Sequence, residues 1–202
     1  MHLPFGRFGH FGPFASSRSH EERQGDRQDA HAAGPQIETF RLTPHAWVPN
    51  NRCLPVIVYR HAFDAATRDL GAQIDRRFAE RGWPVQWHDG VFDYHHFHST
   101  AHEVLGVIAG SAELIVGGPG GRTLRIVGGD VLLLPAGTGH CLATRDDAFQ
   151  VAGGYPHGQQ WDIRRDALTP GELRLMEALP FPACDPVYGE RGPLIEHWTP
   201  QD

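Results

Sequence analysis

The sequence contains little that would place the chain in a membrane, on a nucleic acid or in a disulfide-rich class. No stretch approaches the roughly 18 consecutive apolar residues of a membrane span, and the N-terminus shows no apolar core of a secretory signal. With 18 Lys and Arg against 24 Asp and Glu, the net charge is -6. That acidic balance argues against a basic face for nucleic acid. We therefore expect neither membrane nor nucleic acid as a partner.

Cysteine is also scarce, with three residues in 202: Cys53, Cys141 and Cys184. They are odd in number, widely separated and without a C-x-x-C pair, which fits neither a disulfide framework nor a zinc finger. A reducing compartment, the cytoplasm, is the simplest expectation. Histidine is the abundant exception, with 14 residues, five of which fall within fifteen positions. Because histidine is the commonest metal ligand, this cluster is the first candidate site.

The first 36 residues differ in amino-acid composition from the rest. Phe5, Phe8, Phe11 and Phe14 recur every three residues, a polar run follows, and Leu3 is the only Leu, Ile or Val before Ile37. Such a composition offers little apolar surface to offset the entropy of ordering. We predict a disordered, low-complexity leader at 1–36 and a single folded domain at 37–202. A short aromatic docking motif and a misassigned start are the alternatives.

The folded part combines one helical segment with many short β-like runs. Residues 54–59 form an apolar, β-branched run that predicts a strand. Asp64 is a plausible N-cap for a helix with a stripe at Ala66, Leu70, Ile74 and Phe78 that ends at Gly82. After Gly90, six runs separated by Gly and Pro turns follow at about 102–109, 111–117, 123–127, 130–134, 139–144 and 148–153. This spacing is typical of an all-β sandwich or barrel. Residues 169–179 can form a helix with Pro170 at its first position.

Three imidazoles and a carboxylate are the candidate metal ligands. His96 and His98 are two apart in a segment that looks extended, so alternation directs both to one face. Glu103 follows five residues later, and His140 comes on a later strand after a tight turn. This donor set suits Mn, Fe, Co, Ni, Cu or Zn better than Ca or Mg. We expect one such divalent ion, of unspecified identity, while a solvated His-rich loop is the alternative.

Two gapped motifs around these residues resemble those of the cupin superfamily. The first is Gly90-x5-His96-x-His98-x4-Glu103-x6-Gly110, and the second is Gly129-x5-Pro135-x-Gly137-x2-His140. Thr144 departs from the second motif, which usually carries Asn there. More widely, His96 to Val107, Leu134 to His140, Gly154-Tyr155-Pro156 and Asp185 to Gly189 resemble the small single-domain YjlB-type bacterial cupins. The resemblance implies an all-β jelly-roll barrel (double-stranded β-helix) with a few flanking helices and a metal-binding core at about 85–155.

His102 and Glu103 compete for the fourth ligand position. The spacing His98-x3-His102 resembles four-histidine cupins, whereas His98-x4-Glu103 resembles the three-His, one-Glu set. Glu103-x6-Gly110 keeps the motif's register, and a one-residue slip would turn every later side chain to the other face. Glu103 would then point inward with Leu105 and Val107, opposite to His102. We predict Glu103 as the ligand and keep His102 as the alternative, since a bulge would reverse the order.

Neighbouring residues have a structural interpretation beside a functional one. His95 and Cys141 adjoin ligands and should point away from the site, so Cys141 is expected to be a buried, inert thiol. Tyr94 shares the parity of His96 and His98 and either lines the cavity or packs as an aromatic. Glu113 and Arg125 are expected at the surface, although either could reach a substrate. No catalytic acid or base and no organic cofactor is assigned.

Two classes of function fit this site. One is a metal-dependent enzyme, a dioxygenase-type oxidoreductase or an isomerase, acting on a small organic molecule at open coordination positions. The other is a module that binds or senses metal and a small ligand without turnover. The resemblance favours dioxygenase-type oxidation, and it allows a homodimer. A small-molecule substrate or ligand is expected in either case.

Overall fold

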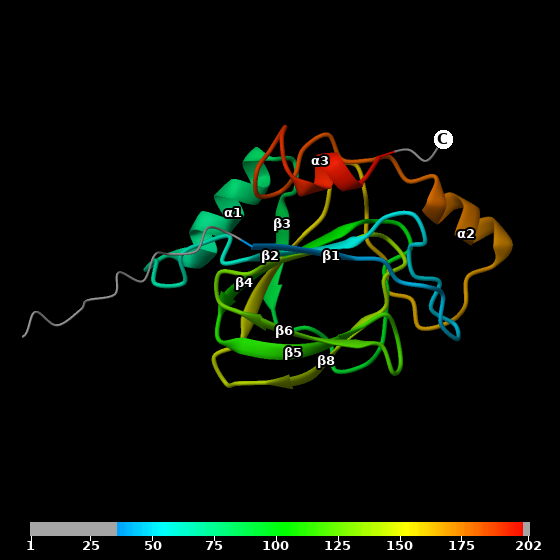
Figure 1. Ribbon diagram of the computed structural model, residues 1–202, viewed down its shortest axis with the longest axis horizontal. Coiled ribbons are helices and arrows are strands. Elements are labelled where there is room, and N and C mark those ends of the chain that lie inside the picture. Colours follow the sequence, from blue (N-terminus) through cyan, green and yellow to red (C-terminus); the bar gives the residue numbers. More distant parts are fainter. Residues whose placement is uncertain (1–35, 200–202) are drawn as a thin grey trace, which may run out of the picture. The chain divides into compact units, whose positions relative to one another are not determined.

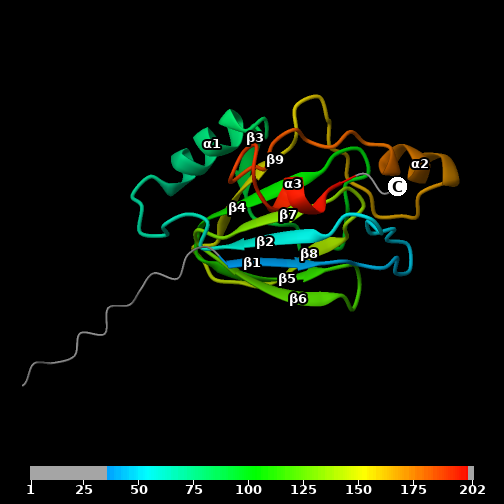
Figure 2. The same ribbon diagram turned by 45° about the horizontal axis from the view of Figure 1, so that its top comes forward.

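The protein's computed structural model describes residues 36–199, which form two antiparallel sheets facing each other (Figures 1 and 2). The larger sheet has the order β1-β2-β7-β4-β9-β3 and the smaller has the order β6-β5-β8. The strands of the larger sheet are β1 (Gln36–Phe40), β2 (Val56–Arg60), β7 (Val131–Leu134), β4 (Glu103–Ala109), β9 (Gln150–Gly154) and β3 (Val85–Asp89). Those of the smaller are β6 (Arg122–Val127), β5 (Ser111–Val116) and β8 (His140–Arg145). This is the jelly roll that the resemblance to cupins implied.

Side-chain alternation divides the core into two layers. Along β2, Val56 and Val58 point between the two sheets, whereas Ile57 and Tyr59 point to the outer face of the larger sheet. The same alternation runs along β4, because successive side chains of a strand point to opposite faces. The cavity described below opens from the inner layer.

Helices cover the outer face of the larger sheet. α1 (Leu70–Glu80) and α3 (Pro193–His197) lie over that sheet, whereas α2 (Pro170–Glu177) lies to one side (Figure 1). Gly106 on β4 permits the close approach of α1, since a Cβ there would lie 2.7 Å from Ile74 Cγ2. Among residues 36–199, no helix has the length and apolar character needed to cross a membrane.

The predicted segments agree with the structure in type and differ at several ends. The six predicted β runs after Gly90 correspond to β4 to β9 with shifts of one or two residues. The predicted helix start at Asp64 is wrong: α1 begins at Leu70, because the Asp64 carboxylate accepts from the Ala66 N–H and closes a turn instead. Strands β1 and β3 and helix α3 were not predicted. Residues 1–35 of the predicted leader lie outside the described residues, and Gln36 begins β1.

A buried carboxylate joins the C-terminal segment to the larger sheet. Asp185 is fully buried and accepts four hydrogen bonds. They come from Tyr59 Oη at 2.6 Å and from the backbone N–H groups of Val187 (2.8 Å), Tyr188 (2.9 Å) and Leu194 (3.0 Å). Because a buried donor without a partner costs about 1–3 kcal/mol, this residue should contribute strongly to folding.

We therefore predict that Asp185→Ala lowers the free energy of unfolding by about 3 kcal/mol or more, since it leaves several buried donors unpaired. Tyr59→Phe is the matched control, because it removes a single hydrogen bond and should cost about 1 kcal/mol. Urea denaturation followed by circular dichroism measures both. Equal losses in the two variants would contradict the role given to Asp185.

Candidate metal centre

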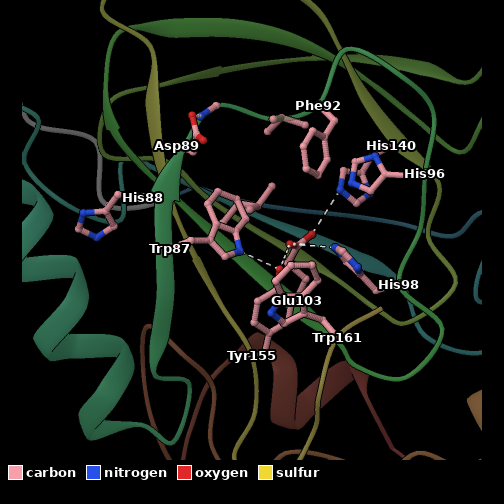
Figure 3. Close-up of a pocket in the computed structure, with 13 residues that line it drawn as sticks. Trp87, His88, Asp89, Phe92, His96, His98, Glu103, His140, Tyr155 and Trp161 are labelled. Carbon is pink, nitrogen blue, oxygen red and sulfur yellow. Dashed lines mark hydrogen bonds and ion pairs between the residues drawn. The ribbon is translucent and has the colours of Figure 1, made fainter. Parts of the chain in front are cut away.

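The four predicted ligands come from three places in the fold and meet in one cavity (Figure 3). Glu103 begins β4 and His140 begins β8, while His96 and His98 lie in the segment that precedes β4. The sequence predicted that segment to be extended, and it lies outside the named strands. It pairs at isolated bridges, where the His96 N–H donates to the His140 carbonyl at 3.1 Å and the His140 N–H donates back at 2.9 Å. The alternation nevertheless holds, because Phe97 points away from the cavity and packs against Trp47.

The ligand atoms converge closely enough for one ion. One nitrogen from each of His96, His98 and His140 lies within 4.8 Å of the other two, and all three side chains are buried. The Glu103 carboxylate lies between two of them. Its Oε1 is 3.2 Å from His98 Nε2, and its Oε2 is 3.3 Å from His140 Nε2. The three histidines could therefore bind a metal ion, with a carboxylate at hand.

Backbone carbonyls fix the orientation of all three rings. The Nδ1–H groups of His96 and His140 donate to the carbonyls of Tyr94 and Thr138, each at 3.1 Å. His98 Nδ1 donates to the carbonyl of Asp162. With Nδ1 occupied in this way, each ring directs Nε2 toward the common centre. Such bonds set the tautomer and orientation that a metal-binding imidazole needs.

The charges in the site favour a cation. Burial opposes ionisation of Glu103, but His98, His140 and the hydroxyl of Tyr155 outweigh it and hold its pKa at about 2. Tyr155 donates to Oε1 at 2.7 Å, whereas Oε2 accepts no hydrogen bond from the described residues. An ionised, 1% exposed carboxylate with an unpaired oxygen fits a metal ligand.

The imidazoles have the matching protonation. Burial lowers the pKa of His96 to about 3 and lowers that of His140 as well, so both are neutral at neutral pH. Burial also acts against a charge on His98, but the Glu103 carboxylate and the Asp162 carbonyl outweigh it and raise that pKa. A metal ion would take the place of the His98 Nε2 proton. This donor set of neutral nitrogens and one carboxylate oxygen fits a divalent transition metal.

His102 points to the other layer from Glu103. Its Nδ1 accepts from the Ala136 N–H at 3.0 Å, and its ring lies 4.8 Å from that of Trp198. Its Nε2 has no hydrogen-bond partner in the described part of the chain. Val104 and Gly106 share its outward face, while Leu105 and Val107 point inward. The register shift recorded along β4 lies between Val107 and Ala109, beyond these residues.

The remaining residues singled out from the sequence lie beside or away from the centre. His95 Nε2 is 3.6 Å from the Sγ of Cys141, and burial raises the pKa of that thiol. The Tyr94 ring stacks on Phe92 at 4.8 Å. Glu113 and Arg125 occupy facing register positions on the adjacent strands β5 and β6, outside the cavity.

Aromatic side chains line a cavity of about 250 Å³ in front of the ligands. Trp87 comes from β3, Phe92 from the loop after it, and Tyr155 and Trp161 from the segment after β9 (Figure 3). Sequence reasoning missed these roles, and also that of Asp162, whose carboxylate accepts from Ser99 Oγ at 2.6 Å. Strand β3 was unpredicted and the segment after β9 is irregular, so no periodicity indicated that either faces the site.

Comparison with known proteins finds a close relative without an assigned activity. The chain is 33% identical over 166 residues to the uncharacterized protein YjlB of Bacillus subtilis (strain 168), across 81% of this chain and 98% of that protein. No family model matches.

Solved structures show more distant likenesses. A DUF861 family protein from Thermotoga maritima is 17% identical, with a TM-score of 0.32 over 50% of this chain and 98% of that one. Acireductone dioxygenase from Bacillus anthracis, solved with cadmium in its active centre, is 21% identical, with a TM-score of 0.31 over 46% and 61%. Neither likeness is close enough to assign an activity to this chain.

Proposed function

The chain belongs to the cupin superfamily, as its relation to YjlB shows, and we propose that it is a metal-dependent enzyme that oxidises a small organic molecule with O2. One observation carries the proposal. The three histidines and Glu103 line the same cavity as the aromatic side chains, so that an ion held by them would face a space for a substrate. A metal site with an open position is typical of catalysis, whereas a structural site is closed by protein ligands.

His96, His98, His140 and Glu103 would hold the ion. A divalent transition metal bound there would supply open coordination positions for a substrate oxygen and for O2. The protein's own part is to orient and to exclude water. The carbonyls of Tyr94, Thr138 and Asp162 hold the rings in place, and the apolar cavity keeps the substrate's reacting carbon away from bulk solvent.

Oxidation is favoured over isomerisation because, among the described residues that line the cavity, the free acceptor atoms at its centre belong to Glu103 and the histidines, which a bound ion would occupy. A general base must lie within hydrogen-bond reach of the proton that it removes. The Tyr155 hydroxyl already donates a hydrogen bond to Glu103. His88 is exposed and pairs with Asp75 at 2.8 Å, and Asp89 is an exposed residue that accepts from the Gly90 N–H.

Oxygen uptake by the metal-loaded protein tests the proposal against a panel of phenols and small organic acids. We expect consumption of O2 with one group of these compounds, its loss after chelation and its return when metal is restored. Product formation with no O2 consumed would indicate an isomerase instead. Tight binding of a compound without turnover would indicate the sensing alternative, and either result would contradict the proposal.

A further inference from the structure

We propose that the cavity selects a small, flat molecule that presents oxygen to the metal, carries no charged group elsewhere and turns only apolar faces to the protein. This inference deepens the proposed function and rests on it. It comes from three properties of the cavity: its size, the hydrogen bonds already made by its aromatic side chains, and the absence of Arg and Lys among the described residues that line it.

Size limits the substrate to about one ring. The cavity measures about 250 Å³, slightly below the range of about 300–1,000 Å³ that is usual for ligand pockets. Trp87 limits it on the β3 side, where its indole lies against Gly153. A Cβ on Gly153 would be 2.1 Å from two of the ring atoms, so this packing requires glycine. Trp161 stacks on Tyr155 with centroids 5.6 Å apart and planes at 19°.

The polar atoms of these aromatic side chains already make hydrogen bonds to other protein groups. Trp87 Nε1 donates to Tyr155 Oη at 3.0 Å, and Tyr155 Oη donates to Glu103 Oε1 at 2.7 Å. Trp161 Nε1 donates to Gln86 Oε1 at 2.9 Å. The three rings therefore offer a ligand their apolar faces and edges. Flat apolar molecules gain most from such contacts.

Charge excludes a second anionic group on the substrate. None of the described residues that line the cavity is an Arg or Lys, and Asp89 adds a negative charge. A carboxylate or phosphate buried there would have no paired cation, which is costly. A divalent ion with Glu103 leaves one net positive charge at the centre. One oxyanion on the metal neutralises it, and a further anionic group is unmatched.

Two catechols of nearly equal size test the inference with zinc-loaded full-length protein, in which no redox turnover occurs. The probes are 4-methylcatechol and 3,4-dihydroxybenzoate, which share the metal-binding diol and differ by a methyl in place of a carboxylate. Quenching of tryptophan fluorescence measures binding, and elemental analysis measures zinc. We expect 4-methylcatechol to bind at least about tenfold more tightly, because the carboxylate is buried without a partner.

Trp161→Ala is the variant, and Phe181→Ala is its control. Both side chains are partly exposed, at 38% and 41%, so neither change should prevent folding, and Phe181 lies outside the cavity. Trp161→Ala should weaken the binding of 4-methylcatechol several-fold at unchanged zinc content. Phe181→Ala should change neither the binding nor the zinc content.

The outcomes separate this inference from the function on which it rests. Protein that fails to retain zinc would overturn the metal centre and the inference with it. Protein that retains zinc but binds 3,4-dihydroxybenzoate equally or better, or binds neither probe, would overturn the inference alone. Equal binding of 4-methylcatechol by Trp161→Ala and the unchanged protein would also contradict it.

Discussion

His140→Ala is expected to abolish tight metal binding while the jelly roll still folds. His140 closes the centre from β8, whereas the other ligands lie within residues 96–103. Removing an outer hydrogen-bond partner of a metal ligand costs roughly 10–100-fold in metal affinity. Removing the ligand His140 itself should cost more. The backbone hydrogen bonds between His96 and His140 do not need the imidazole, so the fold should persist. Metal content after dialysis against a chelator and the thermal unfolding curve measure the two effects.

His95→Ala is the matched control for this change. His95 is also a histidine beside a ligand, but its ring lies near Cys141 rather than in the centre. It should keep stoichiometric metal under the same dialysis. Full metal occupancy in His140→Ala, or equal loss in the two variants, would show that the ion is held elsewhere.

Glu103→Ala is expected to lose the metal, and His102→Ala to keep it. The reason is the opposite orientation of the two neighbours. The Glu103 carboxylate lies within 3.3 Å of two imidazole nitrogens. His102 instead packs on Trp198 and accepts from the Ala136 N–H. Elemental analysis of both purified variants gives the comparison.

His102→Ala should lose stability although it keeps the metal. His102→Ala removes a buried ring and leaves the Ala136 N–H without its acceptor, so its melting temperature should fall even though metal remains. Retention of metal by Glu103→Ala together with its loss in His102→Ala would reverse the assignment of the fourth ligand.

The sequence predicted an all-β sandwich or barrel and the inward face of β4 because both depend on local regularities, whereas the jelly roll itself was implied by the resemblance to cupins. Glycine and proline turns mark the ends of short strands, and alternation along β4 relates Glu103 to Leu105 and Val107 without any long-range information. The resemblance of the second motif to that of cupins then implied that His140 belongs to the same site.

The aromatic cavity could not be predicted, because it depends on contacts between distant segments. Trp87 lies on the edge strand β3, whose mixed exposure gives no apolar run. Trp161 and Asp162 lie in an irregular segment, and the bond from His98 to the Asp162 carbonyl spans 64 positions. The helix start failed for a related reason, since the turn at Asp64 and a helix N-cap use the same side chain.

X-ray absorption spectroscopy of the metal-loaded, full-length protein tests the central claim most directly, because it reports which atoms surround the ion. The structure predicts one transition metal per chain, coordinated only by nitrogen and oxygen, with outer-shell scattering from three imidazoles. Sulfur coordination, which would involve a cysteine such as Cys141, or scattering from fewer than three imidazoles would contradict a centre built from His96, His98, His140 and Glu103.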